Sequence, residues 1–419
     1  KRCRLFIQRN NTTIQVNRFY TIKTGKKKSK KSGLMFMNTS NNFLNPYFVW
    51  VLAPHLETND PNLQYYYDFT QSINEYTKVF NALNAEWMWQ PVTLNNYKTI
   101  IQQIAESANG KTPLVLNLCD GDEINGAPGV SVIHELEKHG LIYTGSDVHF
   151  YNITTSKIPM KTAFDDAGVA TAPWLVITEN YSTGNRVVDK IGAPIIIKPA
   201  VSGGSMGVSV KNVVSTEAEL FERIEEIKKG YRGWNLLADG LFAERFITGP
   251  EYTTFITGSA DDEAFCEVYE PVERVFHHSL PEGEKFLSFD RLWEIYEDEA
   301  PMPQNENFYE YKPVTGEIVS ALKQLSLDAY KACGGKGYTR IDIRQDAGSG
   351  KLYMLEANAQ CGLSEDENYT SIGAIIKASG ISFTEVITEI LKDGIRRAIS
   401  KQQTNEKAPL VINQDLPSF

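Results

Sequence analysis

Short apolar runs alternate with stretches of helical periodicity along the first third of the chain, and this alternation restricts the fold more than any other feature. Runs typical of buried strands lie at residues 47–52, 86–92 and 114–118. A stretch with apolar residues at helical spacing, 65–83, separates the first two, and a helix predicted over 130–139 follows the third. Strands that alternate with helices are typical of a parallel α/β unit, whose ligands usually bind at the carboxyl ends of the strands.

Beyond residue 150 the pattern predicts two further units. The first has helices over 157–166 and 217–229 and strands over 195–199 and 207–210. The second is richer in strands, which are predicted at 242–247, 252–257, 264–271, 337–344 and 351–358, with a helix over 314–333. A chain of 419 residues is too long for one ordinary core. We therefore predict an α/β (α+β) protein with a basic head at 1–40, an N-terminal α/β substrate domain at 41–150, smaller units at 151–235 and 236–400, and a tail at 401–419.

Charge and apolar content exclude two classes of partner. The first 34 residues carry eleven Lys or Arg and no acid, so the rest of the chain is near −21 while the whole is −10. An acidic body lacks the basic face that nucleic-acid binding requires. The longest apolar runs, 48–53 and 193–197, are far too short to span a bilayer. We expect neither a nucleic acid nor a membrane as partner.

The cysteines and the basic head bear on location. Five scattered cysteines without C-x-x-C spacing make neither a disulfide framework nor a zinc site, which favours a reducing compartment and a cytoplasmic protein. The head is interpreted as a tail or a targeting remnant. In the second case the location would be an organelle.

A glycine-rich loop follows the strand predicted at 195–199. Lys198 leaves this strand, and the loop that follows contains Ser202, Gly203, Gly204, Ser205 and Gly207. Glycines let the main chain approach phosphate oxygens closely and turn successive N–H groups toward them. It is not a Walker A loop, because there the lysine follows the glycines. Taken alone, such a segment is more often an ordinary hairpin turn.

Acidic and amide side chains are concentrated on two strands joined by a turn at 346–350. Arg340 and Asp342 share a face of the first strand by period two, as do Glu356 and Asn358 on the second. Two carboxylates and an amide oxygen beside an arginine suit Mg²⁺ and a transferring phosphoryl group. The alternative, a satisfied salt bridge on a solvated sheet face, is favoured slightly when these residues are considered alone.

A third segment, 244–251, alternates in polarity and predicts an edge strand followed by a turn. Its main chain could bond adenine, and Glu251 could accept from ribose hydroxyls. By itself it is an unremarkable strand.

Taken together, these segments resemble the ATP-grasp superfamily and, more narrowly, D-alanine–D-alanine ligase and its relatives. The resemblance covers roughly residues 110–395. It is carried by YTGS (143–146), TSKIPMKTAFDDAGVATAPW (155–174), IIIKPAVSGGSMGVS (195–209), AERFITGPEYT (243–253), GYTRIDI (337–343) and YMLEANAQCGL (353–363).

The resemblance implies an ATP-grasp fold with ATP between the second and third units, and it implies a role for each matching residue. Lys157 and Lys198 would contact the phosphates, and the loop with Ser202, Gly203, Gly204 and Ser205 would fold over them. Glu244 with the main chain of Arg245 and Ile247 would hold adenine, and Glu251 the ribose. Asp342, Glu356 and Asn358 would bind two Mg²⁺, with Mn²⁺ as an alternative. Arg340 would stabilise the transferring phosphoryl group, so that Arg340, Lys198 and Ser205 form the catalytic set.

Four departures from the family pattern bear on the substrates. The family's His-Gly motif reads Asn117–Leu–Cys119–Asp120–Gly121, and its serine pair reads Gly204–Ser205. The family's Lys–Tyr pair has no plain counterpart near residues 291–293. The segment that corresponds to the family's acceptor-carboxylate site, 361–363, is followed by an insertion with acidic residues at 365–367. These acids would favour a cationic acceptor, or they form an ordinary solvated loop.

Our main interpretation is an ATP-dependent carboxylate–amine ligase that joins amino acids or similar molecules through an acyl phosphate, with altered specificity. The first alternative is D-alanine–D-alanine ligase itself, and the second is a non-catalytic ATP-binding module. The expected partners are a small-molecule carboxylate and an amine, and a homodimer is left open.

Overall fold

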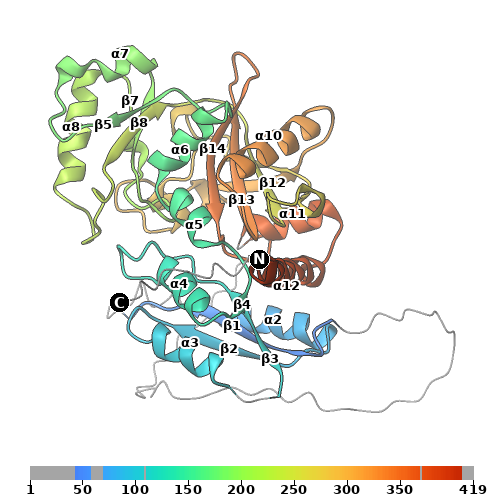
Figure 1. Ribbon diagram of the computed structural model, residues 1–419. Helices are drawn as coiled ribbons and strands as arrows, with labels where there is room; N and C mark the ends of the chain where they lie inside the picture. Colours follow the sequence, from blue (N-terminus) through green and yellow to red (C-terminus); the bar gives the residue numbers. More distant parts are fainter. Residues whose placement is uncertain (1–42, 58–68, 108–109, 369, 408–419) are drawn as a thin grey trace, which may run out of the picture.

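The computed structural model describes residues 43–57, 69–107, 110–368 and 370–407, and three sheets organise them (Figure 1). The predicted basic head, the beginning of the stretch 65–83 and residues 408–419 of the predicted tail lie outside the described residues.

The first sheet is parallel and has the order β2-β1-β3-β4. Its strands are β1 (Tyr47–Pro54), β2 (Trp87–Val92), β3 (Thr112–Asn117) and β4 (Ile142–Tyr143), and its helices are α2 (Thr70–Ala82), α3 (Tyr97–Ala105) and α4 (Val130–Lys138). Val49 and Val51 pack toward α2, whereas Leu52 and Val115 pack toward α3 and α4. Both faces are therefore buried, as expected of a parallel sheet, and the predicted α/β unit is confirmed.

The second sheet is antiparallel, with the order β5-β8-β6-β7. It comprises β5 (Trp174–Ile177), β6 (Ile195–Pro199), β7 (Val213–Val214) and β8 (Leu241–Arg245), and α7 (Val187–Ile191) and α8 (Glu217–Lys228) complete its own core. The strand predicted over 207–210 is wrong, because Gly207 has a φ of +74° and the chain turns into a 3-10 helix at Val210–Asn212. β8 belongs to this sheet, although the boundary predicted after residue 235 assigned it to the third unit.

The third sheet has the order β12-β11-β9-β13-β14, with β10 paired to β9, and all its pairs are antiparallel. Its strands are β9 (Glu251–Thr257), β10 (Glu267–Val268), β11 (Val272–Phe276), β12 (Tyr309–Pro313), β13 (Tyr338–Gln345) and β14 (Leu352–Ala359). The predicted strand 264–271 is mostly wrong, because Glu263–Phe265 forms a 3-10 turn and only two residues pair in β10. β11 and β12 were not predicted.

Three helices cover one face of the third sheet: α5 (Val148–Thr155), α6 (Lys157–Asp166) and α10 (Ile318–Ala332). Phe150, Met160 and Phe164 on α5 and α6 are buried against Ile341 and Ile343 of β13. Helices that the prediction placed in the second unit (151–235) therefore pack on the third sheet.

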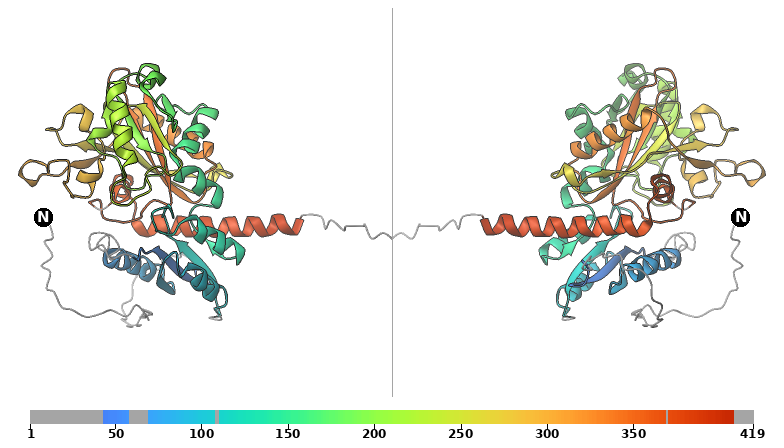
Figure 2. Two further views of the ribbon diagram at one scale, coloured as in Figure 1. Left: turned by 90° about the vertical axis from the view of Figure 1, so that its left-hand side faces the viewer. Right: turned by 90° about the vertical axis from the view of Figure 1, so that its right-hand side faces the viewer.

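Helices α11 (Ser371–Ser379) and α12 (Phe383–Lys407) join the first and third sheets, and Figure 1 shows α12 lying between the two. One core contains Tyr76 of α2, Val386 and Ile390 of α12, and Phe255 and Tyr338 of the third sheet. The first and third sheets therefore share a core, whereas the second sheet has its own. The last turns of α12 extend away from the body (Figure 2).

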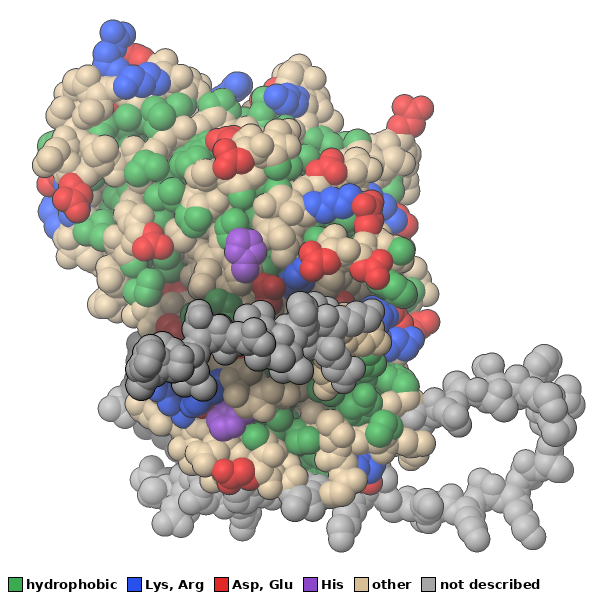
Figure 3. Space-filling model, in the orientation of Figure 1, with side chains coloured by type: hydrophobic (Ala, Val, Ile, Leu, Met, Phe, Trp, Pro, Cys, Tyr) green, Lys and Arg blue, Asp and Glu red, His purple; other side chains and the backbone are tan. Residues whose placement is uncertain are grey.

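Over the described ranges, no helix combines the length and the apolar character that crossing a bilayer requires. On the face in Figure 3, acidic and basic side chains are interspersed.

Candidate active site

The predicted hairpin is confirmed as β13 and β14, and its register aligns the four polar residues. Arg340 lies opposite Asn358 and Asp342 opposite Glu356, with a β-bulge after Asp342. Because side chains alternate along a strand, Ile341 points to the opposite face, where it is buried in the core. The hairpin thus presents one polar face and one apolar face.

The four polar side chains touch one another. Arg340 donates from Nη2 to Asp342 Oδ2 at 3.0 Å, and Asn358 Nδ2 lies 3.4 Å from the same oxygen and 3.3 Å from Glu356 Oε1. Burial alone would raise the pKa of Glu356, but the cations of Lys157, Arg340 and Lys198 lower it to about 2. Glu356 is therefore a carboxylate at neutral pH.

Lys157 connects this hairpin to the glycine-rich loop. It begins α6, and its N–H donates to Ala200 O at 2.8 Å. Its Nζ donates to Ser202 O at 3.0 Å and lies 3.5 Å from Glu356 Oε2. One ammonium group thus lies between the loop and the acidic hairpin, although the two are separated by about 150 residues of sequence.

Lys198 is held by a buried carboxylate that it shares with a second lysine. Glu244, which is 2% exposed, accepts from Lys198 Nζ at 2.7 Å, and its other carboxylate oxygen forms an ion pair with Lys161 Nζ at 2.6 Å. Burial alone would raise the pKa of Glu244, but the two lysines lower it to about 2. Both oxygens of Glu244 are thus paired with lysines, so its side chain orients Lys198 and is not free for a ligand.

Sequence reasoning missed Lys161. It is 1% exposed and also donates to Thr171 Oγ1 at 2.7 Å. Lys161 lies four residues after Lys157, which places both on one face of α6. This spacing is the sequence feature that could have identified Lys161 as part of the site.

Two consecutive residues with positive φ bend the glycine-rich loop. Gly204 and Ser205 have φ values of +54° and +63°, and the N–H groups of Gly203, Gly204 and Ser205 donate to no other residue in the described part of the chain. Successive unpaired N–H groups in such a turn form a concavity that binds anions. The hydroxyls of Ser202 and Ser205 donate to Met206 O at 2.6 Å and Leu287 O at 2.9 Å.

A segment that we call the cover segment, residues 286–299, lies over this loop and contains α9 (Phe289–Leu292). Trp293 Nε1 donates to Gly204 O at 2.8 Å, and Val210 N donates to Glu299 Oε1 at 3.0 Å. A Cβ on Gly204 would come within 2.9 Å of the Trp293 ring, so this close approach requires glycine.

The segment that follows β8 combines a free donor with a buried ion cluster. The N–H of Ile247 donates to no acceptor among the described residues, whereas its carbonyl accepts from Arg344 Nη1 at 3.1 Å. Arg245 is partly exposed and lies 3.6 Å from Asp346. Glu251 is buried between Arg274 and Arg344, which occupy both its oxygens. The structure therefore gives Glu251 protein partners where the sequence suggested ribose hydroxyls.

Comparison with known proteins decides the family. The family model described as "D-ala D-ala ligase C-terminus" matches residues 163–392, more than half of the chain. The chain belongs to this family. A D-alanine–D-alanine ligase of Xanthomonas axonopodis pv. citri (strain 306) is 29% identical over 280 residues, which cover 66% of this chain and 77% of that one. D-alanine–D-alanine ligase B of Xanthomonas campestris pv. campestris is 26% identical over 324 residues, covering 77% and 89%.

Solved structures agree on the fold. The D-alanine–D-alanine ligase from Bacillus anthracis has a TM-score of 0.59 at 17% identity and covers 85% of this chain and 99% of its own. That from Coxiella burnetii has a TM-score of 0.58 at 16% identity, covering 86% and 98%. The predicted ATP-grasp fold and family resemblance are confirmed. The chain is an ATP-dependent ligase of the ATP-grasp type, and the alternative of a non-catalytic module is set aside.

In this ATP-grasp ligase the hairpin has a donor set that fits a hard cation. Asp342 is almost fully buried, and its Oδ1 has no hydrogen-bond partner among the described residues. Rotating the Asn358 amide by 180° would turn its oxygen toward Asp342 and Glu356. No three His, Cys, Asp or Glu side chains converge within the described ranges, so a cation here would rest on two carboxylates, an amide and oxygens of ATP.

The acidic side chains at 365–367 each contact another residue of this chain. Glu365 pairs with Lys78 at 2.5 Å, Glu367 with Lys377 at 2.8 Å, and Asp366 accepts from Gln71 at 3.2 Å. Lys78 and Gln71 lie on α2. The insertion after β14 therefore contacts this helix of the first sheet. These contacts favour a structural loop over a cationic-acceptor site.

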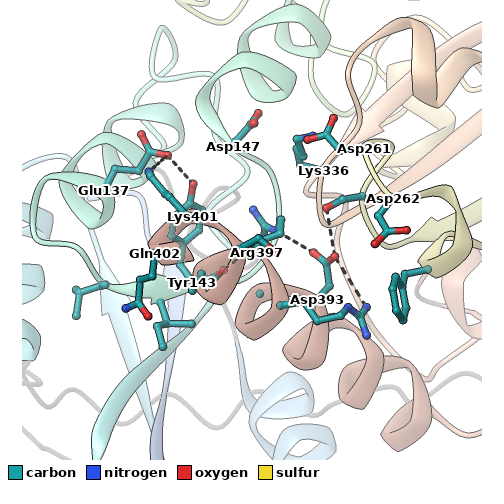
Figure 4. Close-up of a pocket in the computed structure, with 18 of the residues that line it drawn as sticks. Glu137, Tyr143, Asp147, Asp261, Asp262, Lys336, Asp393, Arg397, Lys401 and Gln402 are labelled. Atoms are coloured by element: carbon teal, nitrogen blue, oxygen red, sulfur yellow. Dashed lines mark hydrogen bonds and ion pairs between the residues drawn. The ribbon is translucent and has the colours of Figure 1, made fainter. Parts of the chain in front are cut away.

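A cavity of about 690 Å³ lies away from the glycine-rich loop, between α4, β4 and α12. Figure 4 shows Arg397 beside Asp393, to whose Oδ2 it donates at 2.9 Å, and Arg397 also donates to Gly145 O at 2.8 Å. Polar side chains of its lining contact one another: Lys336 pairs with Asp261, and Ser259 donates to Asp393. The contacts around this cavity therefore connect the first and third units.

Proposed function

We propose that this chain is a D-alanine–D-alanine ligase, which uses ATP to join two D-alanines. The relatives that cover most of the chain carry that name, which favours this reading over our main interpretation of altered specificity. The observation that carries the proposal is the position of Lys157. Its Nζ lies 3.0 Å from Ser202 O of the glycine-rich loop and 3.5 Å from Glu356 Oε2 of the β13–β14 hairpin. A nucleoside triphosphate with its cations would engage both.

The nucleotide would lie between the second and third sheets. The free N–H of Ile247 would donate to adenine beside Arg245, and the loop N–H groups of Gly203, Gly204 and Ser205 would bind the phosphates. Lys157 and Lys198 would offset the phosphate charge. Burial alone would lower the pKa of Lys198, but Glu244 raises it above its ordinary value, so the ammonium form is retained.

At the reacting end, Asp342, Glu356 and Asn358 would hold Mg²⁺ ions, which when bound neutralise charge on the transferring phosphoryl group. Arg340 lies on the same face and would stabilise negative charge that develops there. Its contact with Asp342 at 3.0 Å and its distance of 3.9 Å from Glu356 hold the guanidinium over the hairpin.

The reaction takes place in two displacements. A carboxylate oxygen of the first D-alanine attacks the γ-phosphorus, the bond from that phosphorus to the β-γ bridging oxygen breaks, and ADP leaves with the electron pair. The amine of the second D-alanine then attacks the acyl carbon and loses a proton, and phosphate leaves with the carboxylate oxygen. No protein nucleophile is needed.

The first sheet would form the wall of the amino-acid site. Gln360, just after β14, donates to Asn117 O at 2.7 Å and accepts from Ser146 N at 2.8 Å, which brings the carboxyl end of β3 next to the hairpin. Asp120 follows β3 at this junction. We therefore assign residues 41–150 to the substrate domain of the ligase.

A coupled assay of ADP release tests the proposal. D-alanine with ATP and Mg²⁺ is expected to stimulate ADP release and to give the dipeptide, detected by mass spectrometry, whereas L-alanine gives neither. If other amino acids or amines stimulate ADP release and D-alanine does not, the altered-specificity interpretation replaces this one.

A further inference from the structure

Three charged residues on adjacent strands meet at one level of the third sheet. Glu251 begins β9, and the register places Arg274 of β11 opposite it on one side and Arg344 of β13 on the other. The two arginines bond separate oxygens of Glu251, and all three residues are at most 5% exposed. Burial alone would raise the pKa of Glu251, but Arg344 and Arg274 lower it, so the cluster is ionised.

Arg344 also contacts main-chain carbonyls beyond its counter-ion Glu251. Its Nη1 donates to Ile247 O at 3.1 Å and its Nη2 to Lys285 O at 2.7 Å. The guanidinium also lies 5.6 Å from the centroid of the Phe246 ring, within cation–π range. One side chain thus holds the main chain on the adenine side and the residue just before the cover segment.

These contacts connect two parts of the nucleotide site. Two residues after Lys285, the carbonyl of Leu287 accepts from Ser205 of the glycine-rich loop at 2.9 Å. Ile247, on the other side of Arg344, supplies the free N–H for adenine. A displacement of Arg344 would therefore move the adenine donor and the cover segment together.

We propose that Arg344 is a positioning residue for ATP, which fixes the Ile247 main chain and the start of the cover segment, and that Glu251 is its internal counter-ion and not the ribose ligand. The inference rests on the nucleotide site proposed above. Since both oxygens of Glu251 are occupied by arginines, ribose hydroxyls gain little from it, and the chain discriminates weakly between ATP and 2′-deoxyATP.

Arg344→Met alone leaves Glu251 with a buried oxygen unpaired, which destabilises the fold. The decisive variant is therefore the double substitution Glu251→Gln with Arg344→Met, which removes both charges of that pair. Arg274 then keeps Asp342 as an acidic neighbour at 3.9 Å, and thermal unfolding checks that the double variant is folded, but it still lacks a donor for Ile247 O and Lys285 O. Arg344→Lys keeps the charge without the forked geometry, and Arg186→Met, at an exposed ion pair on the second unit, controls for loss of an arginine.

Calorimetric binding of ATP with Mg²⁺, without amino acids, is the readout. We expect the Kd for ATP to rise about tenfold in Arg344→Lys and in the double variant, to stay unchanged in Arg186→Met, and to differ by less than about threefold between ATP and 2′-deoxyATP in the native chain. Native affinity in the double variant would overturn the positioning role. Discrimination of tenfold or more against 2′-deoxyATP that disappears in Glu251→Gln would overturn the counter-ion role.

The two proposals fail separately. Because binding is measured without turnover, a chain that binds ATP and makes no dipeptide loses the proposed function, while the variants still decide the role of Arg344.

Discussion

Replacing Glu356 with glutamine is expected to lower kcat for ADP release by on the order of 1,000-fold while leaving the melting temperature nearly unchanged. The carboxylate lies between Lys157, Arg340 and Asn358, where it would bind Mg²⁺ against the transferring phosphoryl group. Glutamine keeps the shape but removes the charge. Because the side chain is 28% exposed and is not part of an apolar core, solvent screens its pairing with Lys157 and Arg340, and its loss costs the folded structure little.

The matched control is Glu310→Gln, at an exposed ion pair with Lys312 on β12. It removes one carboxylate from the same sheet and is expected to retain native turnover. Glu356→Gln activity within tenfold of the native value would show that the hairpin does not hold the catalytic cation.

The largest effect on stability is expected from Lys161→Met. Lys161 is 1% exposed, and its loss leaves a buried oxygen of Glu244 without a partner and removes the donor to Thr171. Removing one partner of a buried ion pair lowers the free energy of unfolding by about 3–5 kcal/mol. We expect thermal unfolding to shift down by several degrees, together with weaker ATP binding, because Glu244 also orients Lys198.

Lys190→Met, an exposed lysine on α7, is the control, and its unfolding temperature is expected to match that of the native chain. If Lys161→Met unfolds at the native temperature, the buried Lys161–Glu244 pair does not contribute to stability.

The parts of the site that could be predicted are those set by local sequence. The turn at 346–350 and strand period two predicted which residues share a face of the hairpin, and the structure aligns Arg340 with Asn358 and Asp342 with Glu356. The end of β6 just after Lys198 followed from an apolar run and the glycines after it. These features depend on neighbours only a few residues away.

The parts that were missed depend on long-range pairing. Glu251 lies between Arg274 and Arg344 because three strands align, and a single strand pattern cannot show which partners lie beside it. β12 has mostly exposed or half-buried residues, so its sequence lacks the apolar alternation that marks a strand. α5 and α6 pack on the third sheet because their apolar faces meet β13, which periodicity alone cannot assign.

The central claim is that this site transfers a phosphoryl group from ATP to the carboxylate of D-alanine, and isotope transfer tests it most directly. With D-alanine labelled by ¹⁸O in both carboxylate oxygens, each phosphate released during dipeptide formation is expected to carry one ¹⁸O, since the acyl carbon–oxygen bond breaks in the second displacement. Phosphate released without the label, alongside dipeptide, would contradict the account.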